Sequence, residues 1–251
     1  MTTLVIVPTY DEAESLPRLI DGLAVHAPEV DVLVVDDNSP DGTGRIADAL
    51  AACDARVHVL HRPGKQGLGV AYRAGFAWAL ARDYDVVVEM DADGSHRPQD
   101  LPELLRTLRG GDADLVLGSR WVEGGGVVNW PWYRRLISRG GTWYAQRALA
   151  IPIHDATGGF RAFRRSTLER LPLAEVASQG YCFQVDMVRR VLDAGMSVIE
   201  VPITFVERAW GRSKMSGGIV REAFWRVTVW GCERRIARLR GIRRSHSRST
   251  A

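Results

Sequence analysis

Two aspartates, Asp91 and Asp93, carry the sharpest chemical signal in this sequence. They follow an apolar segment, Val86–Met90, and a single residue, Ala92, separates them. Carboxylates at this spacing suit a hard divalent cation, because Mg²⁺ and Mn²⁺ prefer oxygen ligands and complete their coordination with water and substrate phosphate. A polar turn that caps the next helix is the alternative interpretation. We expect Asp91 and Asp93 to bind Mg²⁺ or Mn²⁺.

Polar residues follow three other apolar segments in the same way. Tyr10 and Glu12 come after Leu4–Val7, Asp36 and Asp37 after Val32–Val35, and Arg120 after Leu115–Leu117. Ligands of open parallel sheets bind at the carboxyl ends of the strands, so the sequence predicts that these side chains meet at one rim. The segment Asp-Asp-Asn-Ser-Pro-Asp-Gly that begins at Asp36 fits either a turn before a helix or a contact to a base or ribose.

Lys65 lies directly before the expected start of a helix at Gly67. A helix N-terminus and a lysine both favour anions, so we interpret Lys65 as a phosphate contact. A solvated loop lysine is the alternative.

Arg134 and Ser138 are four residues apart on a predicted helix and therefore share one face. Together with Arg120 they form a candidate site for a second phosphate. Arg135 and Arg139 fall on the neighbouring face, and a solvated basic helix is the alternative.

Arg208 and Lys214 bracket Ala-Trp-Gly-Arg-Ser, a predicted loop whose Gly211, Gly217 and Gly218 give it freedom to close. A flexible basic loop can close over a pyrophosphate after it binds. A surface loop with incidental charge is the alternative.

Two common cofactor patterns are not supported. Gly42-Thr-Gly44-Arg-Ile-Ala47 matches the dinucleotide fingerprint in form, but it follows the second apolar segment and an acidic loop occupies the phosphate position. His96 and His154 lack the spacing to other His or Cys residues that a zinc site needs. We therefore expect neither a dehydrogenase nor a catalytic zinc site.

The residues up to 120 alternate between short valine-rich segments and segments with helical periodicity. The predicted strands are Leu4–Val7, Val32–Val35, Val57–Leu60, Val86–Met90 and Leu115–Leu117, and the predicted helices are Glu12–Ala27, Gly42–Cys53, Gly67–Arg82 and Gln99–Arg109. This alternation predicts an α/β fold with a mostly parallel central sheet.

Beyond residue 120 we expect strands at Thr157–Phe163 and Val198–Phe205 and helices at Pro131–Ala150, Phe183–Ala194 and Ile219 to about Arg240. The polar last residues are predicted to be disordered. We place a catalytic domain at residues 1–217 and a basic helical tail at residues 218–251.

The charge is distributed unevenly along the chain. The 251 residues carry a net charge of +3, but residues 208–251 hold 12 basic residues against 2 acidic ones, which gives +10 there and −7 in residues 1–207. Arginines beside Phe224, Trp225 and Trp230 fit a helix that lies on an anionic membrane, or alternatively a helix that packs on the core. No nucleic-acid-binding motif is present, so we expect no nucleic acid partner.

Composition and cysteine usage are those of an ordinary globular protein in a reducing compartment. The chain is 46% hydrophobic and 25% charged, and its three cysteines are widely spaced. No stretch reaches the ~20 apolar residues of a spanning helix, and no secretory signal is visible.

These motifs together resemble the inverting nucleotide-sugar glycosyltransferases of family 2, and among them the polyprenol monophosphate mannose synthases. The matching pieces, in chain order, are I-V-P-T-Y-D-E, V-V-D-D-N-S-P-D-G-T, G-K-Q-G-L-G-V-A-Y, D-A-D-G-S-H, G-S-R-W, D-A-T-G-G-F-R and R-A-W-G-R-S-K. The family commonly has Leu-Gln where this chain has Gly94-Ser95, and many relatives carry membrane helices after the catalytic domain, whereas this sequence shows none.

The resemblance implies a GT-A type fold and a GDP-mannose donor. It implies three groups of contacts: Pro8, Tyr10, Glu12, Val35 and Asp37 around the guanosine; Asp91, Ala92 and Asp93 to donor and metal; and Arg120, Arg208 and Lys214 to the phosphates and sugar. Arg134 and Ser138 fall where the family binds the acceptor phosphate.

The resulting hypothesis is transfer of mannose from GDP-mannose to a polyprenyl monophosphate with inversion, in which Asp93, Arg120, Arg208 and Lys214 act in catalysis. No general base is needed, because a phosphate monoester with a second pKa of about 6 is already ionised near neutral pH. A UDP-glucose-dependent polyprenyl-phosphate glucosyltransferase and a non-catalytic nucleotide-sugar-binding module are the alternatives. We expect the protein on the cytoplasmic face of the membrane, held there by the tail, by an integral-membrane partner protein, or by both.

Overall fold

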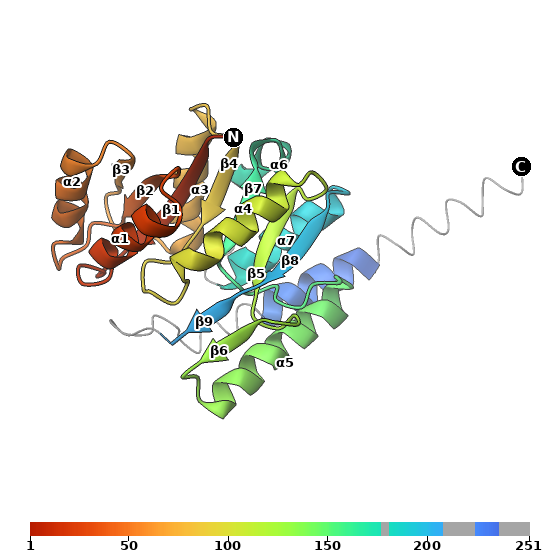
Figure 1. The fold of residues 1–251 in the computed structure, drawn as a ribbon. Coiled ribbons are helices and arrows are strands. Elements are labelled where there is room, and N and C mark those ends of the chain that lie inside the picture. The colour runs from red at the N-terminus through yellow and green to blue at the C-terminus, as the bar shows by residue number, and fades with distance from the viewer. Residues whose placement is uncertain (177–180, 208–223, 236–251) are drawn as a thin grey trace, which may run out of the picture.

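The structure is a computed structural model that describes residues 1–176, 181–207 and 224–235. Its centre is a seven-stranded sheet with the order β3-β2-β1-β4-β7-β5-β8. The strands are β1 (Thr3–Thr9), β2 (Asp31–Asp36), β3 (Val57–His61), β4 (Val86–Glu89), β5 (Leu115–Ser119), β7 (Arg161–Arg164) and β8 (Val198–Pro202). Two more strands, β6 (Gly126–Val128) and β9 (Thr204–Val206), form a small parallel pair beside it (Figure 1).

The helices cover both faces of the large sheet. They are α1 (Leu16–His26), α2 (Thr43–Cys53), α3 (Leu68–Leu80), α4 (Leu101–Arg109), α5 (Trp132–Leu149), α6 (Arg165–Arg170) and α7 (Tyr181–Asp193), with short 3₁₀ helices at Pro98–Asp100 and Leu173–Glu175. Residues 224–235 form a further helix that lies alongside α5 (blue in Figure 1).

Alternation along the strands divides the interior into two apolar layers. In β1, Leu4 and Ile6 pack into the layer covered by α3, α5 and α7, whereas Val5 and Val7 pack into the layer covered by α1 and α4. Successive side chains of a strand point to opposite faces, and a strand buried on both sides is a continuous apolar run. This explains why the valine-rich segments predict the strands so well.

The predicted mostly parallel α/β architecture is confirmed, with one antiparallel strand. β7 runs antiparallel to both of its neighbours, β4 and β5. The predicted strand Thr157–Phe163 was wrong at its start, because residues up to Phe160 form a loop and β7 begins at Arg161. The predicted helix at Glu12 likewise begins later, at Leu16.

The predicted strand Val198–Phe205 is in fact two strands. β8 ends at Pro202 and β9 begins at Thr204, where the chain leaves the large sheet for the small one. Ile203 makes the crossing: its N–H donates to Ser119 O (3.1 Å), and its carbonyl accepts from Gly126 N (3.0 Å). One residue therefore bonds to both sheets, a feature that strand periodicity does not reveal.

The helix predicted from Ile219 to about Arg240 is described at residues 224–235, where it packs on the core with one side. Val227 is buried and Trp230 packs against the core, whereas Phe224 and Trp225 are exposed. The helix approaches α5 closely, because a Cβ added at Gly231 would lie 2.7 Å from Ala148 O. The proposed domain boundary between residues 217 and 218 lies outside the described residues.

No helix in the described part of the chain is long and apolar enough to cross a membrane.

Candidate active site

The turn after β4 fixes both aspartates of the predicted metal site. The Tyr72 hydroxyl donates to Asp91 Oδ1 (3.3 Å), and the backbone N–H of Ser95 donates to Asp93 Oδ1 (3.0 Å). Asp93 is only 6% exposed, and Ala92 between them is buried. The predicted pair is thus held by its own turn and by a buried tyrosine from α3.

His96 organises the same turn. Its Nδ1 accepts a hydrogen bond from the backbone N–H of Asp91 (3.1 Å), so the ring carries its proton on Nε2. The ring is buried and stacks on Phe160, with centroids 5.1 Å apart. Burial lowers the pKa of His96, which keeps the ring neutral and able to accept this bond. Sequence analysis considered this histidine only as a zinc ligand and missed its role in the turn.

The residues present fit a divalent cation. Gly159 lies beside the pair, and a Cβ there would come within 3.5 Å of Asp91 Oδ2, so glycine keeps this side open. Among residues 1–176, 181–207 and 224–235, no group of three or more His, Cys, Asp or Glu side chains could hold a metal. Two carboxylates with room for other ligands match an ion that binds through water and substrate phosphate.

Asp36 and Asp37 have different surroundings. Asp36 Oδ1 accepts from the hydroxyls of Thr9 (2.9 Å) and Ser39 (2.6 Å), which favours the turn interpretation for this residue. Asp37 instead pairs with Arg62 Nη1 at 2.5 Å, and both side chains are 7% exposed. Burial raises the pKa of Asp37 while Arg62 lowers it. Arg62 is a site residue that sequence analysis did not identify.

The structure brings the predicted residues at the ends of β1 and β2 together. Pro8 and Val35 are paired in the sheet register, and Lys65 Nζ lies 4.1 Å from the ring centroid of Tyr10. The loop of Glu12 is tied to the next loop, because the Glu12 N–H donates to Thr43 Oγ1 (3.0 Å). We call this set the β1–β2 rim: Pro8, Tyr10, Glu12, Val35, Asp37 and Lys65.

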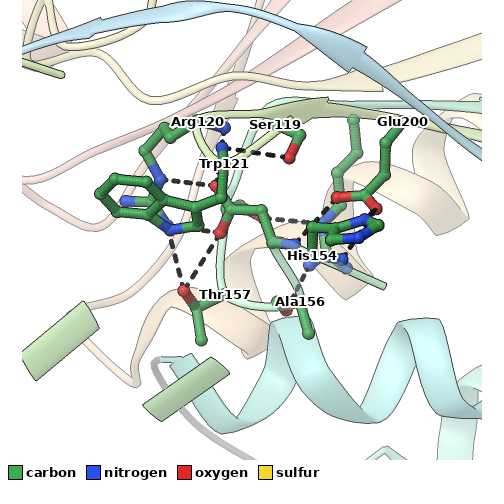
Figure 2. Close-up of polar contacts among 10 residues, drawn as sticks. Ser119, Arg120, Trp121, His154, Ala156, Thr157 and Glu200 are labelled. Carbon is green, nitrogen blue, oxygen red and sulfur yellow. Dashed lines mark hydrogen bonds and ion pairs between the residues drawn. The ribbon is translucent and has the colours of Figure 1, made fainter. Parts of the chain in front are cut away.

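Arg120 forms a buried ion pair with Asp155. Arg120 Nε and Nη2 each lie 2.6 Å from an oxygen of Asp155, and Nη2 also donates to Thr157 Oγ1 (3.0 Å) (Figure 2). The Arg120 guanidinium is 5.4 Å from the ring centroid of Trp130. Asp155 belongs to the D-A-T-G-G-F-R motif, but its partner was not apparent from the sequence.

Arg134 and Ser138 lie on the half-buried face of α5, as predicted. Arg134 forms an ion pair with Glu207. Its guanidinium lies 4.2 Å from the ring centroid of Trp130, the same ring that Arg120 approaches. Arg120 and Arg134 around Trp130, together with Ser138 one turn along α5 from Arg134, are called the arginine cluster below. The predicted contacts of Arg208 and Lys214 lie outside the described residues.

Comparison with known proteins identifies relatives over nearly the whole chain. A family model described as glycosyl transferase family 2 matches residues 4–171. The polyprenol monophosphomannose synthase of Mycolicibacterium smegmatis is 55% identical over 96% of this chain and 91% of its own length. The undecaprenyl-phosphate mannosyltransferase of Micrococcus luteus is 56% identical over 97% of this chain and 98% of its own length.

Solved structures with the same fold include two enzymes with bound nucleotide sugars. A mannosyltransferase of Pyrobaculum calidifontis in complex with GDP-Man and Mn²⁺ has a TM-score of 0.60 and 21% identity, over 94% of this chain and 64% of that one. A glucosyl-3-phosphoglycerate synthase of Mycobacterium tuberculosis in complex with Mn²⁺, UDP-glucose and phosphoglyceric acid has a TM-score of 0.66 and 22% identity, over 92% and 80%. At these identities the likeness shows the fold alone.

Proposed function

The chain belongs to glycosyl transferase family 2, and from this we propose that it transfers mannose from GDP-mannose to a polyprenyl monophosphate with inversion at the anomeric carbon. The names of two relatives that are 55% and 56% identical to it over almost their full length support this reaction. The observation that carries the proposal is that four parallel strands, β1, β2, β4 and β5, end at one edge of a GT-A type sheet and are followed there by Tyr10, Asp37, Asp91, Asp93 and Arg120.

In this proposal the β1–β2 rim binds the nucleoside of the donor. Asp37 is a buried carboxylate oriented by Arg62, which suits hydrogen bonds to a base or ribose. Tyr10 and Lys65 lie beside it, and Lys65 adds positive charge at the side of the diphosphate. The proposed contacts of Arg208 and Lys214 to the donor phosphates complete this half of the site.

Asp91 and Asp93 would hold Mg²⁺ or Mn²⁺ together with the donor pyrophosphate. A divalent cation there supplies charge neutralisation for the departing GDP. Tyr72 and His96 keep the two carboxylates and their turn in place, so little rearrangement is needed when donor binds. The solved mannosyltransferase with GDP-Man and Mn²⁺ supports a divalent metal in this fold.

Arg134 and Ser138, with Arg120, would bind the acceptor phosphate. The acceptor oxygen is already ionised near neutral pH, so the protein has only to position it and offset its charge. This is consistent with a site made of arginines and a hydroxyl. Positioning and electrostatic stabilisation would therefore provide most of the rate acceleration.

We further propose that the protein docks peripherally on an anionic lipid surface through the outward face of α5. Five large apolar side chains on this face are 54–73% exposed: Trp132, Tyr133, Leu136, Ile137 and Trp143. Arg135 and Arg139 are exposed among them, and apolar side chains interleaved with arginines are typical of helices that bind anionic bilayers. The inward face of α5 carries Arg134 and Ser138. Docking through the outward face would therefore bring the proposed acceptor-phosphate site close to the phosphate of a lipid in the membrane.

We propose that α5 docks on the cytoplasmic face of the membrane. The chain has only three cysteines, Cys53, Cys182 and Cys232, and they are widely spaced in the sequence, as is usual in a reducing compartment. An integral-membrane partner protein stays a prediction from the family resemblance.

A transfer assay tests the proposed reaction. Purified protein is incubated with polyprenyl phosphate and radiolabelled GDP-mannose or UDP-glucose, with Mg²⁺, Mn²⁺ or a chelator. We expect labelled lipid from GDP-mannose only, and none with the chelator. Labelled lipid from UDP-glucose instead would show that UDP-glucose, and not GDP-mannose, is the donor. The absence of lipid product under every condition would reject the enzyme proposal.

Vesicle sedimentation tests the membrane proposal separately. Binding to vesicles of phosphatidylglycerol and phosphatidylcholine should exceed binding to phosphatidylcholine alone. The double variant Leu136→Glu/Ile137→Glu should lose this binding by about tenfold or more, because charged residues replace two apolar side chains that would enter the lipid surface. Val25→Glu is the matched control, since Val25 is 73% exposed on α1. Equal binding of both variants would reject α5 as the docking face.

A further inference from the structure

Asp155 fixes the direction in which the Arg120 guanidinium faces. Two side-chain contacts of 2.6 Å and a bond from the Arg120 backbone N–H (3.0 Å) all end on the Asp155 carboxylate. The Arg120 side chain is 5% exposed and that of Asp155 is fully buried. A buried arginine paired at two nitrogens has little freedom to turn, so the position of Asp155 sets the position of Arg120.

Glu200 in turn fixes the backbone that carries Asp155. Its two carboxylate oxygens accept from consecutive backbone N–H groups, those of His154 (2.7 Å) and Asp155 (2.8 Å). Glu200 lies on β8 and its side chain is 8% exposed, whereas the His154 ring on its outer side is 62% exposed (Figure 2). The ring Nδ1 of His154 is a further neighbour of Glu200, at 2.9 Å.

The other side of the same loop is held by Arg161. Its guanidinium donates to the carbonyls of Ala156 (2.9 Å) and Gly158 (2.8 Å) from beneath the sheet rim. Glu200 therefore holds the loop by its N–H groups and Arg161 by its carbonyls. A loop fixed from both sides gives Asp155 one defined position.

From these contacts we infer that Glu200 is a positioning residue for mannosyl transfer, which acts through Asp155 on the orientation of Arg120. The inference rests on the proposed function of Arg120 in phosphate binding. Glu200 itself contacts neither substrate in this scheme. Its carboxylate suits this task because each of its two oxygens accepts from one of two neighbouring N–H groups.

A double-mutant cycle tests this coupling. Glu200→Gln replaces one acceptor oxygen with an NH₂ group, which cannot accept from a backbone N–H. It should lower kcat about tenfold, as expected for the loss of a charge-assisted hydrogen bond. In an Arg120→Lys background, where no bidentate pair with Asp155 can form, the same substitution should lower the remaining kcat less than about twofold. Asp155→Asn should show the same dependence on Arg120.

Two further variants separate positioning from stability. Glu200→Asp keeps both acceptor oxygens and should recover part of the activity lost in Glu200→Gln. Asp114→Asn is the matched control, because Asp114 Oδ2 accepts from the Ser197 N–H (2.8 Å) at the opposite end of the same strand pair. It should leave kcat unchanged even if the unfolding temperature falls as much as in Glu200→Gln.

The outcomes distinguish the two proposals. An equal loss of kcat from Glu200→Gln in both backgrounds, or an equal loss in Asp114→Asn, would overturn the positioning inference while Arg120 keeps its role. Unchanged transfer in Arg120→Lys would instead reject the proposed role of Arg120.

Discussion

In the loop of residues 36–43, which borders the β1–β2 rim, several supporting hydrogen bonds are local, whereas in the arginine cluster they join distant parts of the chain. Asp36 accepts from Ser39, and Asp41 accepts from the N–H and hydroxyl of Thr43, two or three residues away. Arg120 pairs with a residue 35 positions later and Arg134 with one 73 positions later. Local bonds thus shape the first region in part, although its Asp37–Arg62 pair spans 25 residues, and the second region is assembled by the packing of β5, β8 and α5.

This difference teaches where sequence motifs are informative. A loop whose polar groups bind one another leaves a contiguous pattern, such as Asp-Asp-Asn-Ser-Pro-Asp-Gly. A cluster whose charges are paired across strands leaves isolated arginines with no visible partner. Variants in the two regions should therefore fail in different ways.

The largest effect is expected at the turn between the two regions. Asp93→Ala removes a proposed metal ligand and should reduce mannosyl transfer by about 1000-fold, since charge stabilisation by a bound metal is worth several kcal/mol. Circular dichroism should stay close to the wild type, because Asp93 lies in a turn outside the helices and strands, where the substitution removes the side-chain hydrogen bond with the Ser95 N–H. Near-normal transfer would contradict the metal assignment.

A pair of arginine variants tests the comparison directly. Arg62→Ala leaves the buried Asp37 without its partner and should raise KM for GDP-mannose about 10- to 100-fold with little change for the lipid. Because Arg62 lowers the pKa of Asp37, its loss raises that pKa further, so donor binding should weaken as the pH falls.

Arg134→Ala should show the opposite selectivity, with a KM increase of similar size for polyprenyl phosphate and little change for GDP-mannose. Steady-state kinetics with each substrate varied in turn measure both. If each variant affected both substrates equally, the division of the site into two regions would be wrong.

Alanine substitutions at two glycines, Gly75 and Gly231, compare how the packing beneath each of the two regions contributes to stability. A Cβ at Gly75 of α3 would lie 2.6 Å from Ile6 Cγ2 of β1, so Gly75→Ala should lower the free energy of unfolding by about 1–3 kcal/mol. Gly231→Ala creates an equally close contact to Ala148 O of α5. It should loosen only the helix of residues 224–235, which hydrogen exchange would detect, and leave the main denaturant transition in place.

The smallest predicted effect is a pH dependence of stability from Glu89, beneath the site. Burial raises its pKa from 4.5 to about 7, although Arg161 opposes the shift. The folded state then binds a proton that the unfolded state has lost, so stability falls as the pH rises from 4.5 to 7. The slope should approach about 1 kcal/mol per pH unit. Urea unfolding with a chelator present measures it.

Glu89→Gln is the comparison variant for this measurement. It should remove that part of the slope, because glutamine does not titrate. A slope identical to that of the wild type would show that Glu89 titrates in the folded protein as it does in the unfolded chain.

The sequence alone was sufficient for the first five strands and for the polar residues that follow them. Valine-rich segments buried on both faces predicted β1 to β5, and the polar residues after them predicted the positions of Asp37, Asp91 and Arg120 at one edge. The reason is physical: periodicity and burial act on neighbouring residues, so they remain visible in one dimension.

Only the tertiary structure decided the partners of the charged residues. Arg62 for Asp37, Asp155 for Arg120 and Glu207 for Arg134 could not be predicted, and neither could the antiparallel insertion of β7. A buried charge needs a partner at a defined distance, and the strand order decides which of the many acidic residues reaches it. The sequence therefore determined which polar groups follow the strands at this edge of the sheet. The packing of β5, β8 and α5 determined which way Arg120 and Arg134 face.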